Sequence, residues 1–185
     1  MKAYSQDLWF RRSQVCYILY LIVNANAVGK VGIEVRRAYL AGLIDGDGCI
    51  MATIERHREK KFGFRVRVEV KLTLKEKGLL ETFVREFNIG HVHCNRRHTA
   101  LATHDWVIRD KNDTASLLRF IQPYSRLKHK QIGIALQILR CNVRVPKDLL
   151  RNARLADTLS RLNVRSKNRR KNFATMIKIP ISSND

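Results

Sequence analysis

Two aspartates that stand two positions apart are the residues best placed to do chemistry in this sequence. Asp45 and Asp47 close the stretch LAGLIDGDG, which covers residues 40–48. The segment from Val35 onwards predicts a helix that ends at the glycines of this stretch. Both carboxylates therefore fall at a helix C-terminus, where the macrodipole disfavours negative charge by about 0.3–1 kcal/mol each. A helix that delivers acids at this end is suited to holding a cation.

The same helix carries a regular stripe of small residues. Ala38, Gly42 and Gly46 recur every four positions, so a second backbone can approach this face closely. Asp45 lies about 200° around the helix from Asp47, and the two carboxylates cannot face the same site while the helix persists. We therefore expect Asp45 to form hydrogen bonds with neighbouring backbone or with a partner helix.

The nine residues resemble the signature of the LAGLIDADG homing endonucleases, with Gly46 where the family name has alanine. The resemblance implies that Asp47 binds metal beside the main-chain carbonyl of Gly46. Ligation by oxygen alone suits Mg²⁺, for which Mn²⁺ can substitute. Divalent ions that flank a phosphodiester supply an activated water, neutralise charge and assist the leaving 3′ oxygen. The implied activity is site-specific double-strand cleavage of DNA that leaves 3′ overhangs, by a protein that an intron encodes.

A basic segment later in the chain resembles another part of the family site. The stretch PYSRLKHKQ at residues 123–131 places Lys128 where relatives have a lysine near the active-site water and phosphate. A lysine there stabilises developing negative charge. A solvated helix face is the alternative, because Arg126 and Lys130 are equally basic.

One copy of the signature and no internal repeat are present, so a second acidic helix must come from another chain. A two-fold homodimer is the simplest solution, with Ala38, Gly42, Asp45 and Gly46 at its interface. Some relatives place a glutamine where this chain has Leu74. Its absence favours two rival functions: an RNA maturase that binds the host intron, and a DNA-binding regulator without cleavage.

The clearest periodic signal predicts a long strand. Apolar and polar residues alternate from Phe62 to Leu74, which gives one apolar face and one basic, polar face. Around this strand we expect further strands at 49–58, 91–95 and 99–108. We expect helices at 35–46, 79–87 (ended by Gly90), 113–122 (capped by Asp113), 127–141 and 146–162. Their order predicts an α+β fold with a four-stranded antiparallel sheet and helices on one face. It matches the αββαββα core and saddle-shaped sheet of the resembled family.

Three regions follow from this reading. Residues 1–33 form an N-terminal extension, 34–145 the endonuclease core, and 146–185 a basic C-terminal helix and tail.

The polar sides of the two hairpins are the expected DNA-reading surface, because an antiparallel ribbon fits the major groove. Arginine and lysine suit guanine, asparagine suits adenine, and acids accept from cytosine, although an ordinary solvated sheet face is the alternative. A half-site of roughly 10 base pairs in each subunit predicts a long, nearly palindromic target. Residue parity assigns to this surface Thr53, Glu55, His57, Arg65, Arg67, Glu69, Lys71, His93, Asn95, Arg97 and Asp105.

Charge supports a polyanionic partner. Lysine and arginine number 36 against 16 acids, a formal net charge of +20, and so large an excess is costly as self-repulsion unless a polyanion is bound. Charge alone would equally suit a generic RNA-binding protein. The apolar run Val15–Val23 is too short to span a bilayer, and export would separate a DNA enzyme from its substrate. We expect an intracellular protein with access to DNA, in the cytoplasm, nucleoid or an organelle.

Overall fold

The structure is a computed structural model that describes residues 32–95, 102–163 and 173–177. Helix α3 leads into a long hairpin, a second helix into a second hairpin, and four helices follow. The elements are α3 (Ile33–Asp47), β1 (Gly48–Arg56), β2 (Phe64–Leu74), α4 (Lys77–Phe87), β3 (His91–Asn95), β4 (Thr103–Ile108), α5 (Lys111–Ile121), α6 (His129–Arg140), α7 (Pro146–Asn163) and α8 (Phe173–Met176). The predicted order is confirmed, and α8 is an addition to it.

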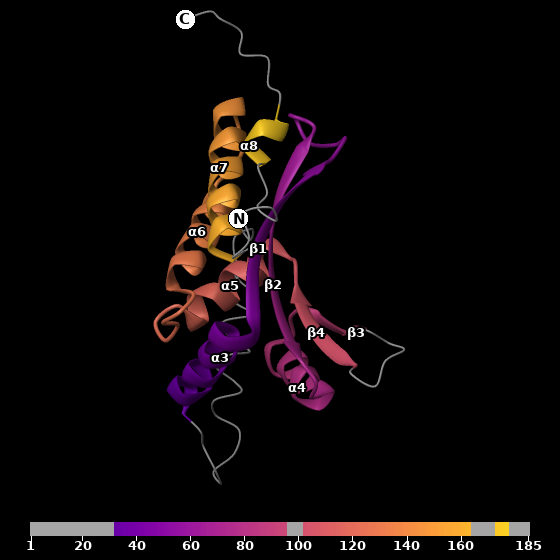
Figure 1. Cartoon of the computed structure of the whole chain (residues 1–185), viewed down its shortest axis with the longest axis vertical. Coiled ribbons are helices and arrows are strands. Elements are labelled where there is room, and N and C mark those ends of the chain that lie inside the picture. The colour runs from indigo at the N-terminus through magenta and orange to yellow at the C-terminus, as the bar shows by residue number, and fades with distance from the viewer. Residues whose placement is uncertain (1–31, 96–101, 164–172, 178–185) are drawn as a thin grey trace, which may run out of the picture.

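The strands form one antiparallel sheet in the order β1-β2-β4-β3. In Figure 1 the helices lie on one side of this sheet, and the β1–β2 hairpin extends beyond the shorter β3–β4 hairpin. The expected α+β fold is therefore confirmed. Because β4 lies between β2 and β3, it is an internal strand although it is the last in the chain.

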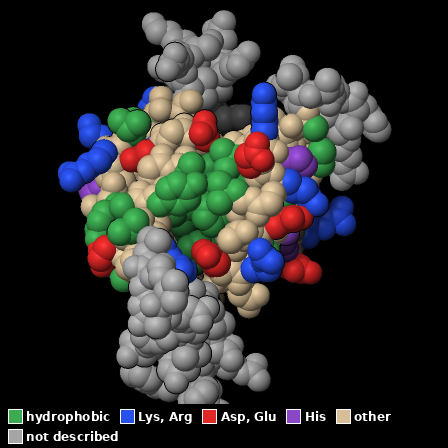
Figure 2. All heavy atoms as spheres, turned by 90° about the horizontal axis from the view of Figure 1, so that it is seen from below, with side chains coloured by type: hydrophobic (Ala, Val, Ile, Leu, Met, Phe, Trp, Pro, Cys, Tyr) green, Lys and Arg blue, Asp and Glu red, His purple; other side chains and the backbone are tan. Residues whose placement is uncertain are grey.

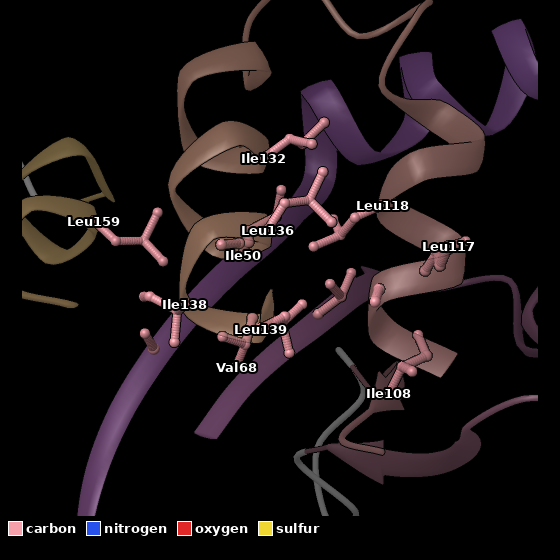
Figure 3. Close-up of a cluster of buried hydrophobic side chains, with 14 of the residues drawn as sticks. Ile50, Val68, Ile108, Leu117, Leu118, Ile132, Leu136, Ile138, Leu139 and Leu159 are labelled. Atoms are coloured by element: carbon pink, nitrogen blue, oxygen red, sulfur yellow. The ribbon is translucent and has the colours of Figure 1, made fainter. Parts of the chain in front are cut away.

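The core lies between the sheet and the helices. Alternate residues of the two long strands are buried, among them Ile50, Val68 and Val70. They meet side chains from α5, α6 and α7, as Figure 3 shows for Leu118, Leu136 and their neighbours. Each such side chain contributes roughly 1.5–3 kcal/mol through removal of apolar surface from water. The period-two pattern thus determines which face of the sheet packs against the helices and which face is left uncovered by them.

Several predicted boundaries differ from the observed ones, and three of them concern the ends of helices. Helix α4 ends at Asn88, which adopts the left-handed conformation with φ of 50°, rather than at Gly90. Helix α5 is capped by Asp110, whose Oδ1 accepts from the backbone N–H of Asn112 at 2.7 Å; Asp113 is not the cap. Helix α6 begins at His129, with Lys128 as its N-cap residue.

The predicted extension at 1–33 lies almost entirely outside the described residues, as does most of the tail after 163. In the part that the structure describes, none of the helices combines the length and apolar character that crossing a bilayer requires.

Candidate functional site

The aspartate motif lies where a helix changes directly into a strand. The last turn of α3 is closed by the backbone N–H of Gly48, which donates to the carbonyl of Ile44. A Cβ at Gly48 would lie 2.6 Å from that carbonyl oxygen and 2.7 Å from the Ile44 Cα. Only glycine therefore lets β1 begin at once where α3 ends. This junction places the two acids against the edge of the sheet.

The carboxylate of Asp45 is buried and is engaged within its own chain. It accepts from the Ser125 hydroxyl at 2.5 Å and from the backbone N–H groups of residues 126, 127 and 128 at 2.6, 3.0 and 3.1 Å. Burial alone would raise the pKa of Asp45, but these hydrogen bonds together hold the pKa below its ordinary value. The expected hydrogen bonding to backbone is present. The expected place of Asp45 at a dimer interface stays a prediction, and its carboxylate itself points to the start of α6.

The carboxylate of Asp47 differs from that of Asp45. Asp47 is the last residue of α3 and is exposed, as is Gly46 beside it. Among the described residues, none donates a hydrogen bond or forms an ion pair with the Asp47 side chain. The two carboxylates of the motif therefore differ. Both oxygens of Asp45 accept hydrogen bonds within the chain, whereas the carboxylate of Asp47 is open to a ligand.

Lys128 reaches the same helix end from a segment 80 residues further along the chain. Its ammonium donates to the main-chain carbonyl of Asp45. The side chain is half-buried. The structure thus brings Lys128 to the residue that precedes Gly46, and its role beside the active-site water and phosphate stays a prediction.

Cys49 connects this helix end with the polar face of the sheet. Cys49 pairs with Lys71 across the β1–β2 ladder. Burial raises the pKa of the Cys49 thiol above its ordinary value, and the nearby ammonium groups of Lys71 and Lys128 only partly oppose the rise. The motif and the polar sheet face therefore form one continuous surface.

Strand register places the predicted DNA-reading residues on one face. Thr53 lies opposite Arg67, Glu55 opposite Arg65, and Asp105 is flanked by Thr73 on one side and His93 on the other. Asn95, at the end of β3, is exposed. His57 follows β1, at the start of the turn that closes the hairpin. Arg97 lies outside the described residues.

The acids of this face are paired with cations of the same face. Glu55 accepts from Arg65 at 2.8 Å and also from Arg67. Glu69 accepts from the Arg109 Nε at 2.5 Å. These pairs give the acids a use besides base recognition, because they neutralise arginines that would otherwise repel one another.

Asp105 does not fit the expected reading role. Its residue is only 6% exposed, and its carboxylate accepts from the Thr73 hydroxyl at 2.7 Å and lies 3.4 Å from the Lys71 ammonium. Parity assigned its face correctly, but the carboxylate is covered and is engaged by Thr73 and Lys71 of the neighbouring strand.

Sequence reasoning missed two residues of the site. Ser125 is 3% exposed and donates to the Asp45 carboxylate, a long-range contact for which the sequence offers no local signal. Arg109 extends the polar row of β4 past the end of the strand, and continued parity from Asp105 would have included it.

The outer face of α3 is exposed. Ala38, Gly42 and Gly46 all lie on it, with Val35 57% and Tyr39 51% exposed alongside. A Cβ at Gly42 or at Gly46 would meet nothing within 4 Å. Figure 2, a view from the end of the molecule where α3 and α4 lie, shows hydrophobic side chains gathered at its centre with charged groups around them. An exposed apolar patch of this kind is typical of a protein–protein contact.

Comparison with known proteins adds three findings. The family model described as LAGLIDADG endonuclease matches residues 40–138. The DNA endonuclease I-CreI of Chlamydomonas reinhardtii is 29% identical over 103 residues, which cover 55% of this chain and 60% of that protein. The match therefore spans less than two thirds of I-CreI.

Solved structures agree with the fold. The homing endonuclease I-CvuI, in complex with the I-CreI target in the presence of Mg with the DNA not cleaved, has a TM-score of 0.68 at 25% identity, and the match covers 79% of this chain and 94% of that one. The archaeal intron-encoded homing endonuclease I-Vdi141I, complexed with DNA, has a TM-score of 0.67 at 19% identity, covering 79% and 96%.

Proposed function

Because the chain belongs to the LAGLIDADG endonuclease family, we propose that it is a homing endonuclease that cuts both strands of a specific DNA site as a homodimer with Mg²⁺. The observation that carries the proposal is the division between the motif acids. Asp45 is bonded within its own chain, whereas Asp47 is open at the same helix end, beside Lys128. A scaffold that only bound DNA would have no need of an open carboxylate there.

The metal ligands would be the carboxylate of Asp47 and the main-chain carbonyl of Gly46. Both residues are exposed, and both supply the hard oxygen atoms that Mg²⁺ prefers. When bound, a divalent cation activates water and neutralises phosphate charge. I-CvuI was solved with target DNA in the presence of Mg or of Ca. Mn²⁺ would substitute for Mg²⁺.

The role of Lys128 is to stabilise negative charge that develops on the phosphate. Its ammonium is fixed at the end of α3 and needs no metal ligation to act. Asp45 would not bind the metal, because both of its carboxylate oxygens already accept hydrogen bonds from residues 125–128.

A second copy of the chain supplies the second half of the site. The exposed stripe of Ala38, Gly42 and Gly46 would pack against the same stripe of the partner, so that each subunit delivers one Asp47 to one DNA strand. The exposed apolar side chains of Val35 and Tyr39 on the same helix support this contact. The target would then be long and nearly palindromic.

Double-stranded DNA would lie on the polar sheet face. Arg65, Arg67 and Lys71 are half-exposed there, and the two arginines stand opposite Glu55 and Thr53 of β1. Cleavage that leaves 3′ overhangs, encoding within an intron and an intracellular location with access to DNA belong to the same proposal.

One observation favours a second candidate, a DNA-binding regulator that has lost cleavage. No glutamine stands at or beside Leu74, where it would position water.

The deciding experiment uses the intron-less host allele, Mg²⁺ and sequencing of the fragment ends. The wild-type protein should cut at one site and leave 3′ overhangs. Asp47→Asn should lose at least about 100-fold in cleavage rate, since removal of charge stabilisation of this kind costs about 100- to 1,000-fold, and it should still bind the target in Ca²⁺. Specific binding without any wild-type cleavage would instead establish the regulator. Unchanged cleavage by Asp47→Asn would remove the metal assignment.

A further inference from the structure

Lys128 is held at both of its ends by one residue. Its backbone N–H donates to the Asp45 Oδ1 at 3.1 Å, and its ammonium donates to the main-chain carbonyl of Asp45. A lysine side chain has four rotatable bonds and normally samples many rotamers. Contacts at the backbone N–H and at the terminal ammonium remove most of that freedom. Lys128 is thus a preorganised cation rather than a mobile one.

The anchor itself is rigid. The Asp45 carboxylate also accepts from the Ser125 hydroxyl and from the backbone N–H groups of Arg126 and Leu127. Asp45 and Ser125 are 9% and 3% exposed. Ionised carboxylates that accept from backbone N–H groups make strong hydrogen bonds of fixed geometry. The start of α6 is therefore fastened to the end of α3 at a point two residues from Asp47.

We propose that Asp45 is a positioning residue for the cleavage step, which it serves by holding the Lys128 ammonium beside the end of α3 that bears Asp47. The inference rests on the proposed function. This role differs from a purely structural one. Hydrogen bonds that only joined two helices would affect the stability of the protein and not its cleavage rate. If Asp45 acts through Lys128, its effect on cleavage disappears once the lysine side chain is absent.

The first test compares Asp45→Asn with Asp157→Asn. Asp157 is a matched control: it is 7% exposed and accepts from the backbone N–H groups of Phe173 and Ala174 at the start of α8. We expect Asp45→Asn to slow single-turnover cleavage by about 10-fold or more, since small displacements of a reacting group cost up to about 100-fold. Its target affinity in Ca²⁺ should stay within about threefold. Asp157→Asn should lower the melting temperature and leave the cleavage rate unchanged.

The second test is a double-mutant cycle with Lys128→Ala. The double variant should cleave no more slowly than Lys128→Ala alone. Rate losses that multiply would show that Asp45 acts independently of Lys128 and would overturn the proposal.

If Asp45→Asn does not fold, Ser125→Ala decides, because it removes one of the hydrogen bonds and leaves the charge. It should slow cleavage by a few-fold at unchanged affinity, and a wild-type rate would count against the proposal. Wild-type cleavage is the reference throughout. Its absence would contradict the proposed function, whereas a normal rate in folded Asp45→Asn overturns only the positioning role.

Discussion

The acidic side chains at the end of α3 and on the polar face of the sheet have different kinds of hydrogen-bond donor. Asp45 accepts chiefly from backbone N–H groups, whose positions the start of α6 fixes. On the sheet, Glu55 and Glu69 accept from the ends of long arginine side chains that are 29–46% exposed. The first arrangement cannot be changed without moving a helix, whereas the second requires only side-chain rotation.

The difference indicates how the two tasks are divided. Exposed ion pairs contribute only about 0.2–1 kcal/mol each, so phosphates or bases can displace them at little cost. A buried carboxylate with several backbone donors has no such freedom. The groups proposed for chemistry are thus in place before DNA arrives, and the groups proposed for recognition are completed by contact with it. Four predictions test this contrast.

Removing one cation from each region in turn should separate the cleavage rate from the affinity for DNA. Lys128→Ala should lower the single-turnover cleavage rate about 100-fold by removing a preorganised charge, with target affinity changed less than about threefold. Arg67→Ala should do the reverse, weakening binding by about 1–3 kcal/mol with the rate at saturating protein retained. Fluorescence anisotropy and gel-based cleavage measure both quantities. Equal losses of rate and affinity in both variants would contradict the division of tasks.

The proposed function requires a second copy of the chain to pack against α3. Gly42→Leu should shift the protein from dimer to monomer in sedimentation experiments and abolish double-strand cutting, because bulk on the stripe prevents close approach of two backbones. Within its own chain a Cβ at Gly42 meets nothing within 4 Å. Gly78→Leu is the matched control, since Gly78 is also exposed and open on a helix. Equal behaviour of the two variants would place the dimer contact elsewhere.

The ion pairs on the sheet should control the specificity of DNA binding rather than its affinity. Glu55→Gln releases Arg65 and Arg67 to phosphates of any sequence, so affinity for unrelated DNA should rise about three- to tenfold and become more salt-dependent. Glu81→Gln removes the same charge from a pair on α4 and is the control. A rise of the same size in that control would reduce the effect to net charge.

The smallest effect concerns stability against pH. The hydrogen bond from Arg65 is the main cause that holds the pKa of Glu55 below its ordinary value of 4.5. The stabilisation, about 1 kcal/mol at most, should be complete above pH 4.5 and vanish as pH falls through the lowered pKa. Thermal melts of the wild type and of Glu55→Gln should therefore differ at pH 7 and converge as the pH falls through the lowered pKa. A difference that persisted in acid would mean that the carboxylate charge is not its source.

Much of the fold could be predicted because hydrophobic periodicity is a local property. The alternation from Phe62 to Leu74 determined both a strand and the face that it buries, and the order of elements followed the same logic. The boundaries were less certain. Asn88, rather than Gly90, ends α4, since asparagine tolerates the left-handed conformation when its neighbours require it.

The site could be predicted only in part. The motif identified the acids, and helix geometry separated Asp45 from Asp47. It did not show that the partners of Asp45 lie at residues 125–128, because no local signal encodes a contact across 80 positions. Parity placed Asp105 on the polar face, but only the tertiary structure decided that its carboxylate is covered and engaged by Thr73 and Lys71.

The sequence by itself determined the elements, their faces and the acidic motif, since each depends on residues close together in the chain. The tertiary structure decided which acid is bonded and which is open, where Lys128 reaches, and which arginines are paired. Those properties depend on burial and on distances between segments that meet only when the chain has folded.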